Sequence, residues 1–233
     1  MINFIFDIDG TLTVPRQQMD NTFKEFMLDF TRMHTCYLCT GSDRAKTVEQ
    51  IGEELTNQFK LAYHCSGNHV FENGKEIYKS EWQLSGEEYW FLENELNNVK
   101  YFEKTGNHIE QRTGTANFSI CGRNATYEQR QNYITWENTR TNTRTDIATK
   151  FNNMFGHKSF AVVGGEISID IFRRKCDKSQ IRKQIIGDAV YFGDHCFPGG
   201  NDYAISKLCE VSHQIDNGWQ QTFSILQNQY HNQ

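Results

Sequence analysis

The 233-residue chain contains no apolar run approaching the roughly 18–20 residues that a membrane-spanning helix needs. Its first residues, Met1 to Phe6, also lack the basic leader and the small-residue cleavage site of a signal peptide. We therefore expect a cytoplasmic protein that has no membrane partner.

Positive charge and a pattern of paired cysteines are lacking as well. The chain has 24 Lys and Arg against 29 Asp and Glu, a net charge of −5, whereas binding along a nucleic-acid backbone needs a basic face. We expect no nucleic-acid partner, although a small anionic ligand needs only a few local arginines. The seven cysteines are an odd number without a framework spacing, so we expect them to be reduced.

Short apolar runs alternate with amphipathic segments at both ends of the chain. Strands are predicted at residues 2–6, 35–40, 61–65 and 189–192, with helices between or after them. Thr22 and Ser42 are predicted to cap the helices that follow the first two strands. This alternation is typical of an α/β fold with a parallel sheet.

The middle of the chain follows another pattern. Strand-like segments near 107–121, 160–163 and 166–172 are grouped with helical regions near 85–96 and 126–155. Such grouping, rather than strict alternation, indicates an α+β module. We predict a Rossmann-like α/β core of residues 1–78 and 174–233, interrupted by an inserted α+β cap of residues 79–173.

Asp7 and Asp9 directly follow the first predicted strand, within the segment FDIDGTLT. Ligands of open α/β sheets bind at the carboxyl ends of the strands, and two neighbouring carboxylates favour a cation beside them. Oxygen ligands together with a phosphate partner favour Mg²⁺. The alternative interpretation is a loop with solvated acids or a generic cation site.

This segment resembles DxDG(T/V), the first motif of the haloacid dehalogenase (HAD) superfamily of phosphotransferases. The resemblance implies a HAD-type core in which Asp7 attacks phosphorus as the nucleophile. Asp9 would protonate the leaving oxygen and later activate the acceptor. The further motifs of the superfamily have candidates in the expected order. Thr40 or Ser42 would bind the transferred phosphoryl group, with the choice between them open, and Lys178 would neutralise charge at the site.

The last motif of the superfamily supplies another carboxylate for the metal. Asp194 follows the predicted strand at 189–192, and Asp202 comes close behind it. The resemblance implies that the metal set is Asp7, Asp9, Asp194 and Asp202.

Across most of its length the chain resembles the eukaryotic-type phosphomannomutases. The segments that carry this resemblance are FDIDGTLT followed by Pro15-Arg16, GSDRAKTVEQIG, IEQRTG, Cys121-Gly122-Arg123 with Arg130 downstream, GGEISIDIF, Asp177-Lys178 and FGDHCFPGGNDY. In that family arginines hold the phosphate remote from the reaction, and a Ser and an Asp on a cap strand hold sugar hydroxyls. The matching positions are Arg16, Arg112, Arg123, Arg130, Ser168 and Asp170. Ser168 and Asp170 share one strand face, and planar guanidinium groups suit phosphate recognition.

The resemblance implies an isomerase that interconverts mannose 6-phosphate and mannose 1-phosphate and feeds GDP-mannose synthesis. It further implies Mg²⁺ as cofactor, hexose 1,6-bisphosphate as activator, a hexose phosphate substrate and a homodimer formed through the cap. A sugar-phosphate phosphatase of the same superfamily is the alternative. A non-catalytic relative is a third interpretation, and the retention of Asp7, Asp9, Lys178 and Asp194 argues against it.

The chain departs from the family pattern in places. Thr40-Gly41-Ser42 stands where the family has Gly-Gly-Ser, which is closer to the phosphatase members of the superfamily. The family's Asp-Pro-Arg-Thr segment is replaced by Leu208-Cys209-Glu210, so no second cation site is predicted. Mannose and glucose phosphates would present similar hydroxyls to Ser168 and Asp170, which leaves the preference between them open.

Overall fold

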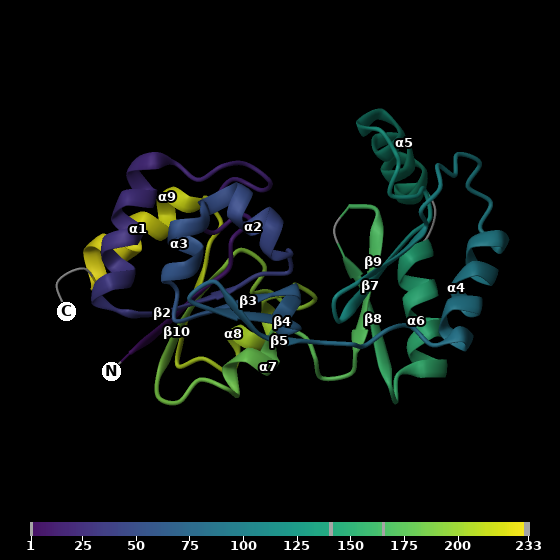
Figure 1. The fold of residues 1–233 in the computed structure, drawn as a ribbon. Coiled ribbons are helices and arrows are strands. Elements are labelled where there is room, and N and C mark those ends of the chain that lie inside the picture. The colour runs from purple at the N-terminus through teal and green to yellow at the C-terminus, as the bar shows by residue number, and fades with distance from the viewer. Residues whose placement is uncertain (1, 140–141, 165, 231–233) are drawn as a thin grey trace. The chain divides into compact units, whose positions relative to one another are not determined.

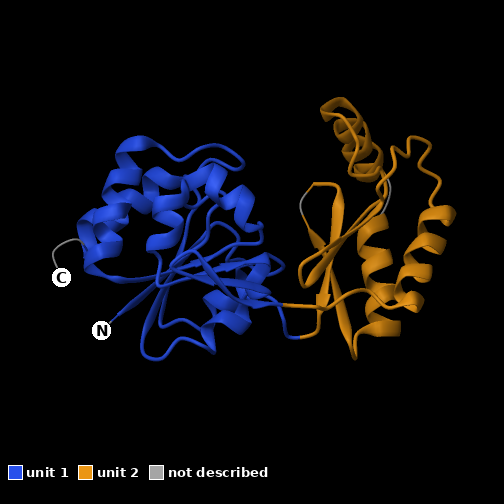
Figure 2. Ribbon diagram, viewed as in Figure 1, with its two compact units in different colours: residues 1–79, 175–233 blue, residues 80–174 orange. Residues whose placement is uncertain are grey.

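The computed structural model describes residues 2–139, 142–164 and 166–230. The chain divides into two compact units (Figure 2): the core unit, residues 1–79 and 175–233, and the inserted unit, residues 80–174. These boundaries lie one residue from the predicted ones. Each unit has its own sheet and its own apolar core.

The core unit is built on a seven-stranded sheet in the order β11, β10, β1, β2, β3, β4, β5 (Figure 1). From β11 to β3 neighbouring strands are parallel, and β4 and β5 are antiparallel additions. The chain leaves β1 towards β2 on one side and returns as β10 on the other, so a topological switch point lies between β1 and β10. The strands are β1 (Asn3–Phe6), β2 (Thr35–Cys39), β3 (Leu61–His64), β4 (His69–Glu72), β5 (Lys75–Lys79), β10 (Ala189–Gly193) and β11 (Val211–Gln214).

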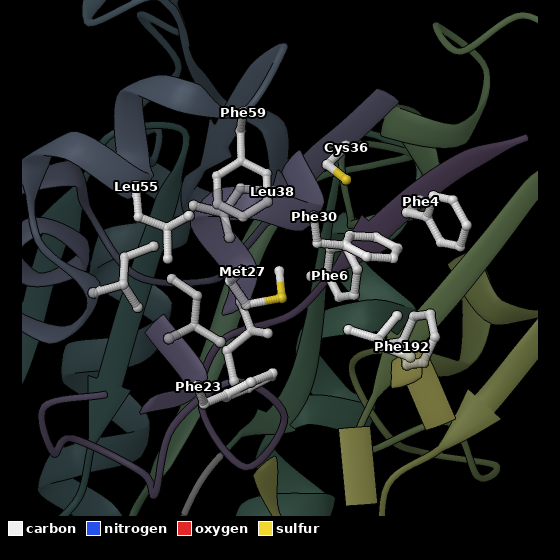
Figure 3. Packing of buried hydrophobic residues seen from close by; sticks show 14 of the residues in the cluster. Phe4, Phe6, Phe23, Met27, Phe30, Cys36, Leu38, Leu55, Phe59 and Phe192 are labelled. Carbon is white, nitrogen blue, oxygen red and sulfur yellow. The ribbon is translucent and has the colours of Figure 1, made fainter. Parts of the chain in front are cut away.

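Helices cover both faces of this sheet because its central strands are apolar on both faces. Phe4 and Phe6 of β1 belong to one buried cluster (Figure 3) and Ile5 to the other, as the two-residue period of a strand requires. Helices α1 (Asn21–Met33), α3 (Glu53–Gln58) and α9 (Trp219–Ile225) lie on the face of Phe4 and Phe6. Helices α7 (Ser179–Arg182) and α8 (Tyr203–Ser206) lie on the face of Ile5.

Three short elements complete the core unit. They are helix α2 (Arg44–Ile51), which follows β2, a 3₁₀ turn (Cys65–Gly67) after β3 and a π-helical turn (Leu226–Tyr230) after α9. None of the helices in the described part of the chain is long and apolar enough to cross a membrane.

Two predicted helix caps are wrong by one or two residues. Asp43, rather than Ser42, caps α2 by accepting a hydrogen bond from N of Lys46, and Asp20, rather than Thr22, caps α1. An aspartate competes well at these positions because its negative charge also favours the helix N-terminus.

The inserted unit has a four-stranded antiparallel sheet in the order β6, β7, β9, β8, with α4 and α6 packed on one face (Figure 1). The helical region predicted over 126–155 forms two helices, α5 and α6. On β9, Ile169 and Ile171 enter the apolar core, whereas Ser168 and Asp170 belong to the other face. The elements are α4 (Gly86–Asn98), β6 (Ile109–Arg112), β7 (Thr115–Ser119), α5 (Tyr127–Asn138), α6 (Thr143–Phe155), β8 (Ser159–Gly164) and β9 (Ser168–Arg173).

Candidate active site

The carboxyl ends of β1, β2 and β10 bring predicted site residues to one edge of the core sheet. β1 pairs in parallel with β10 on one side and with β2 on the other. Directly after β1, the backbone N–H of Asp7 donates to O of Phe192 at 2.9 Å. This pairing places Asp7 and Asp194 at the switch point, where open α/β sheets bind their ligands, and Thr40 at the end of the neighbouring strand β2.

Lys178 joins two carboxylates in the interior of the core unit. Its Nζ lies 2.6 Å from Oδ1 of Asp7 and 2.6 Å from Oδ1 of Asp202, and the side chain is 1% exposed. Burial alone would lower the pKa of Lys178, but the charges of Asp202 and Asp7 outweigh burial and raise this pKa well above its ordinary value. Lys178 is therefore a fixed positive charge beside Asp7.

Asp202 holds this lysine in place. Its Oδ1 accepts hydrogen bonds from Nζ of Lys178 and from the hydroxyl of Tyr191, each at 2.6 Å, and its Oδ2 accepts from the backbone N–H of His195 at 3.1 Å. Burial acts to raise the pKa of Asp202, but Lys178 and the hydrogen-bond donors lower it overall. Asp202 and Lys178 thus form a buried ion pair that positions the ammonium group against Asp7.

Burial and nearby negative charges together affect Asp7 more strongly than Lys178 does. Burial is the largest effect, and together with the charges of Asp202 and Asp194 it raises the pKa of Asp7 to about 8 although Lys178 acts to lower it. A carboxylate in such surroundings is stabilised by a further positive charge. The electrostatics of Asp7 therefore fit a site that binds a divalent cation.

The residues around Asp194 fit such a cation in space and in chemistry. A Cβ atom on Gly10, whose φ is +79°, would collide with Oδ2 of Asp194, so the glycine allows the carboxylate to approach the loop after β1. Asp194, His195 and Asp202 offer ligand atoms that all lie within 4.8 Å of one another. Carboxylate oxygens are the ligands that Mg²⁺ prefers.

Asp9 is held through one oxygen of its carboxylate. Oδ1 accepts hydrogen bonds from the backbone N–H of Arg16 at 2.8 Å and from Nε2 of Gln50 at 2.9 Å. Arg16 makes this contact through its backbone N–H, and its φ is +64°. The contact does not involve the guanidinium group, so its phosphate-binding role stays a prediction.

Thr40 and Ser42 differ in burial. Thr40 is 2% exposed, and its Oγ1 accepts a hydrogen bond from the backbone N–H of Ser42 at 3.0 Å. Ser42 is partly buried and lies at the start of the loop before α2. The structure therefore links the two candidates, and the choice between them stays open.

Within the inserted unit, residues predicted to bind substrate gather on the sheet face opposite the apolar core. Strand register places Glu110, Asn117 and Asp170 in one row across β6, β7 and β9. Nδ2 of Asn117 donates to Oδ1 of Asp170 at 2.6 Å. Burial raises the pKa of Asp170, against the lowering effects of Asn117, Arg112 and Arg123.

Arg112 and Arg123 converge on one acid, Glu110. Nε of Arg112 donates to Oε2 of Glu110 at 3.0 Å, and Nε of Arg123 lies 3.3 Å from the same oxygen. The guanidinium of Arg130 donates to O of Ala125 at 3.1 Å and to O of Arg123 at 3.4 Å. Two predicted phosphate-binding arginines thus already share an anionic partner.

Ser168 is buried on this face of the inserted unit. Its Oγ donates to O of Gly164 at 2.9 Å, and its carbonyl accepts from Nη1 of Arg144 at 3.2 Å. The structure therefore places Ser168 beside Asp170 on β9, whereas Arg16 belongs to the core unit.

Sequence reasoning did not single out Gln50 and Tyr191. Gln50 lies within the matching segment GSDRAKTVEQIG, and its signal was a polar residue on the inward face of α2. Tyr191 interrupts an apolar strand with one hydroxyl group, which needs a partner when it is buried. Both features can be read from the sequence, but neither indicates that Gln50 binds Asp9 or that Tyr191 binds Asp202.

Known proteins resemble this chain along most of its length. A family model described as eukaryotic phosphomannomutase matches residues 23–231. The phosphomannomutase of Spinacia oleracea is 32% identical over 212 residues, which cover 86% of this chain and 84% of that protein.

Two solved structures share the fold at low identity. An N-terminally truncated IMP-nucleotidase of Plasmodium falciparum has a TM-score of 0.65 at 15% identity, covering 99% of this chain and 70% of that one. A haloacid dehalogenase-like hydrolase of Bacteroides thetaiotaomicron has a TM-score of 0.58 at 12% identity, covering 89% and 85%. Together with the parallel sheet, these matches confirm the predicted α/β fold of the HAD type.

Proposed function

Because this chain belongs to the eukaryotic phosphomannomutase family, we propose that it interconverts mannose 6-phosphate and mannose 1-phosphate through a phosphoryl group carried by Asp7. Membership confirms the family identified from the motifs and the phosphotransferase class of the enzyme. The observation that carries the proposed mechanism is the buried contact of 2.6 Å between Lys178 and Oδ1 of Asp7.

The contact with Lys178 gives the two carboxylate oxygens of Asp7 different roles. Because the ammonium group holds Oδ1, Oδ2 is the oxygen that attacks phosphorus. The bond from Oδ2 to phosphorus forms, the bond from phosphorus to the sugar oxygen breaks, and Asp9 gives that oxygen a proton. Covalent catalysis of this kind replaces one difficult transfer by two easier ones.

Mg²⁺ would be held by Asp7 and Asp194, with Asp9 and Asp202 as the remaining members of the predicted set. When bound, it would offset the negative charge of the carboxylates and of the transferring phosphoryl group. The raised pKa of Asp7 supports this assignment, because burial and the charges of Asp202 and Asp194 outweigh the compensating charge of Lys178. Thr40, or Ser42 beside it, would donate a hydrogen bond to the transferred group.

Arg16, Arg112, Arg123 and Arg130 would contact the second phosphate of the substrate, the one remote from the reaction. Ser168 and Asp170 would hold sugar hydroxyls. Two phosphate sites suit a hexose 1,6-bisphosphate, which primes Asp7 and is also the intermediate of the reaction. After the bisphosphate turns end for end, its other phosphoryl group returns to Asp7.

Assembly and compartment follow from the same proposal. We propose that two copies pair through the inserted unit and that the enzyme works in the cytoplasm. Analytical ultracentrifugation of the full chain and of a chain with charges introduced on the inserted unit tests the first point. A single monomeric species of the unaltered chain at micromolar concentration would contradict it.

Phosphorus NMR tests the proposed reaction directly. The full chain is mixed with Mg²⁺, mannose 1-phosphate and a trace of hexose 1,6-bisphosphate, and mannose 6-phosphate is expected to appear without inorganic phosphate. Steady release of inorganic phosphate instead would identify a sugar-phosphate phosphatase. Asp7→Asn is the matched control and is expected to form neither product.

A further inference from the structure

Gln50 is a buried glutamine whose amide group reaches the loop after β1. The residue is 4% exposed, and its backbone carbonyl accepts a hydrogen bond from N of Met19 at 2.8 Å, which anchors the end of α2. Nε2 donates to Oδ1 of Asp9 at 2.9 Å and to Oγ1 of Thr13 at 3.3 Å. One amide group thus contacts both ends of the turn between Asp9 and Thr13.

The chemistry of the carboxylate fixes the orientation of this amide. An ionised carboxylate only accepts hydrogen bonds, so Nε2 rather than Oε1 must face Asp9. The backbone N–H of Arg16 donates to the same Oδ1 at 2.8 Å. With two donors on Oδ1, the plane of the carboxylate is set and Oδ2 is the oxygen directed elsewhere.

Oε1, the carbonyl oxygen of the same amide, has a less favourable environment than Nε2. Oε1 of Gln50 is buried, and no hydrogen-bond partner for it occurs among the residues that the structure describes. A buried acceptor without a partner costs free energy, and an apolar side chain of the same length would avoid that cost. The hydrogen bond that Nε2 of Gln50 donates to Asp9 must therefore have a benefit that outweighs the cost of burying Oε1.

We propose that Gln50 is a positioning residue for proton transfer by Asp9. This inference rests on the proposed function, in which Oδ2 of Asp9 gives a proton to the sugar oxygen as the bond between that oxygen and phosphorus breaks. Gln50 keeps Oδ1 in place, so that Oδ2 carries the proton at the departing oxygen. In the return step the same oxygen takes the proton from the hydroxyl group that attacks the phosphoryl group on Asp7.

The proposal predicts that the need for Gln50 depends on the leaving group. With hexose 1,6-bisphosphate the departing group is a sugar alkoxide, which needs a proton. With acetyl phosphate the bond from phosphorus to acetate breaks and acetate departs as a stable anion without one. Loss of Gln50 should therefore slow phosphorylation of Asp7 by the first donor and not by the second.

The test measures the rate of phosphoenzyme formation by rapid acid quench on the full chain with Mg²⁺. Gln50→Met keeps the length of the side chain and removes the donor. We expect a loss of roughly 10- to 100-fold with hexose 1,6-bisphosphate, a part of the factor of about 10² to 10⁴ that general acid catalysis supplies. With acetyl phosphate we expect a loss below about threefold.

Two further variants keep the test independent of folding. Gln50→Glu preserves the shape and turns the donor into an acceptor, and it is expected to show the same difference between the two phosphoryl donors. Gln58→Met is the matched control, because Nε2 of Gln58 donates to the backbone carbonyl of Leu28 at 3.0 Å within the same unit. It is expected to leave both rates unchanged.

Asp9→Asn separates failure of this inference from failure of the proposed function. If Asp9→Asn shows the leaving-group difference while both Gln50 variants slow the two donors equally or not at all, the positioning role is overturned and the proposed function stands. If the unaltered chain forms no phosphoenzyme from either donor, the proposed function fails and the role of Gln50 fails with it.

Discussion

The two units carry charged clusters that differ in burial. In the core unit the side chains of Lys178 and Asp202 are 1% and 0% exposed, and short hydrogen bonds hold both. In the inserted unit the side chains of Arg112, Glu110 and Arg123 are 37%, 34% and 24% exposed. A buried pair cannot lose one partner without leaving an isolated charge, whereas partly exposed arginines can exchange one anion for another. The core cluster is thus suited to fixing a reacting group, and the inserted cluster to capturing and releasing a ligand.

The largest effect is expected from Asp7 itself. Asp7→Asn keeps the shape of the side chain and its buried position but removes the nucleophile, so mannose phosphate turnover should fall by at least about 10⁴-fold. Thermal unfolding and circular dichroism serve as the control for the fold. Substantial turnover by a folded Asp7→Asn protein would refute the covalent mechanism.

Lys178 sharpens the contrast in stability between the two clusters. Lys178→Met leaves Asp202 and Asp7 buried beside each other without their cation, so the free energy of unfolding in urea should fall by about 3 kcal/mol or more. Lys150→Met is the matched change in the inserted unit, because Lys150 pairs with Glu95 at 2.9 Å but is 58% exposed. Its cost should be below about 1 kcal/mol, and equal costs for the two variants would remove the distinction.

Arg123 probes ligand capture rather than stability. Arg123→Ala should reduce kcat/KM for hexose-phosphate transfer by roughly 10- to 100-fold, since a hydrogen bond to a charged phosphate contributes about 1.5–3 kcal/mol. Hydrolysis of acetyl phosphate, which has no second phosphate, provides the internal control and should change little. Equal losses on both substrates would exclude Arg123 from the remote-phosphate role.

The smallest effect is expected from the anion that the arginines already share. Glu110→Gln removes the negative charge that Arg112 and Arg123 share in a partly exposed cluster. Because this charge no longer competes with the substrate phosphate, KM for mannose 1-phosphate should fall by about two- to fivefold with kcat unchanged. Glu95→Gln, elsewhere in the same unit, is the comparison. An increase in KM would mean that Glu110 orients the arginines for the substrate instead of competing with it.

The sequence predicted best those features that depend on neighbouring residues. The apolar run of β1 and the acids directly after it indicated both the central strand and the site at its end. β5 was missed because all five of its residues, Lys75–Lys79, are exposed and form no apolar stripe. Helix caps were misplaced where Asp20 and Asp43 lay within two residues of the predicted ones.

Contacts between distant parts of the chain could not be predicted from local sequence patterns. Gln50 and Asp9 are 41 residues apart, and Lys178 and Asp7 are 171 apart. Lys178 was predicted only because the resemblance supplied its place in the order of motifs. The sequence assigned Asp202 to the metal set because it follows Asp194, whereas its hydrogen bonds with Lys178 and Tyr191 depend on how β10 and α7 pack.

Phosphoryl transfer through Asp7 is tested by locating the phosphoryl group on the chain. The full chain with Mg²⁺ is mixed with hexose 1,6-bisphosphate labelled in its phosphoryl groups, quenched in acid and digested, and the labelled peptide is sequenced by mass spectrometry. We expect label on the peptide containing Asp7 and its loss on addition of mannose 1-phosphate. A protein that converts mannose 1-phosphate while carrying no label on Asp7, or carrying it on Thr40 or Ser42, would contradict phosphoryl transfer through Asp7.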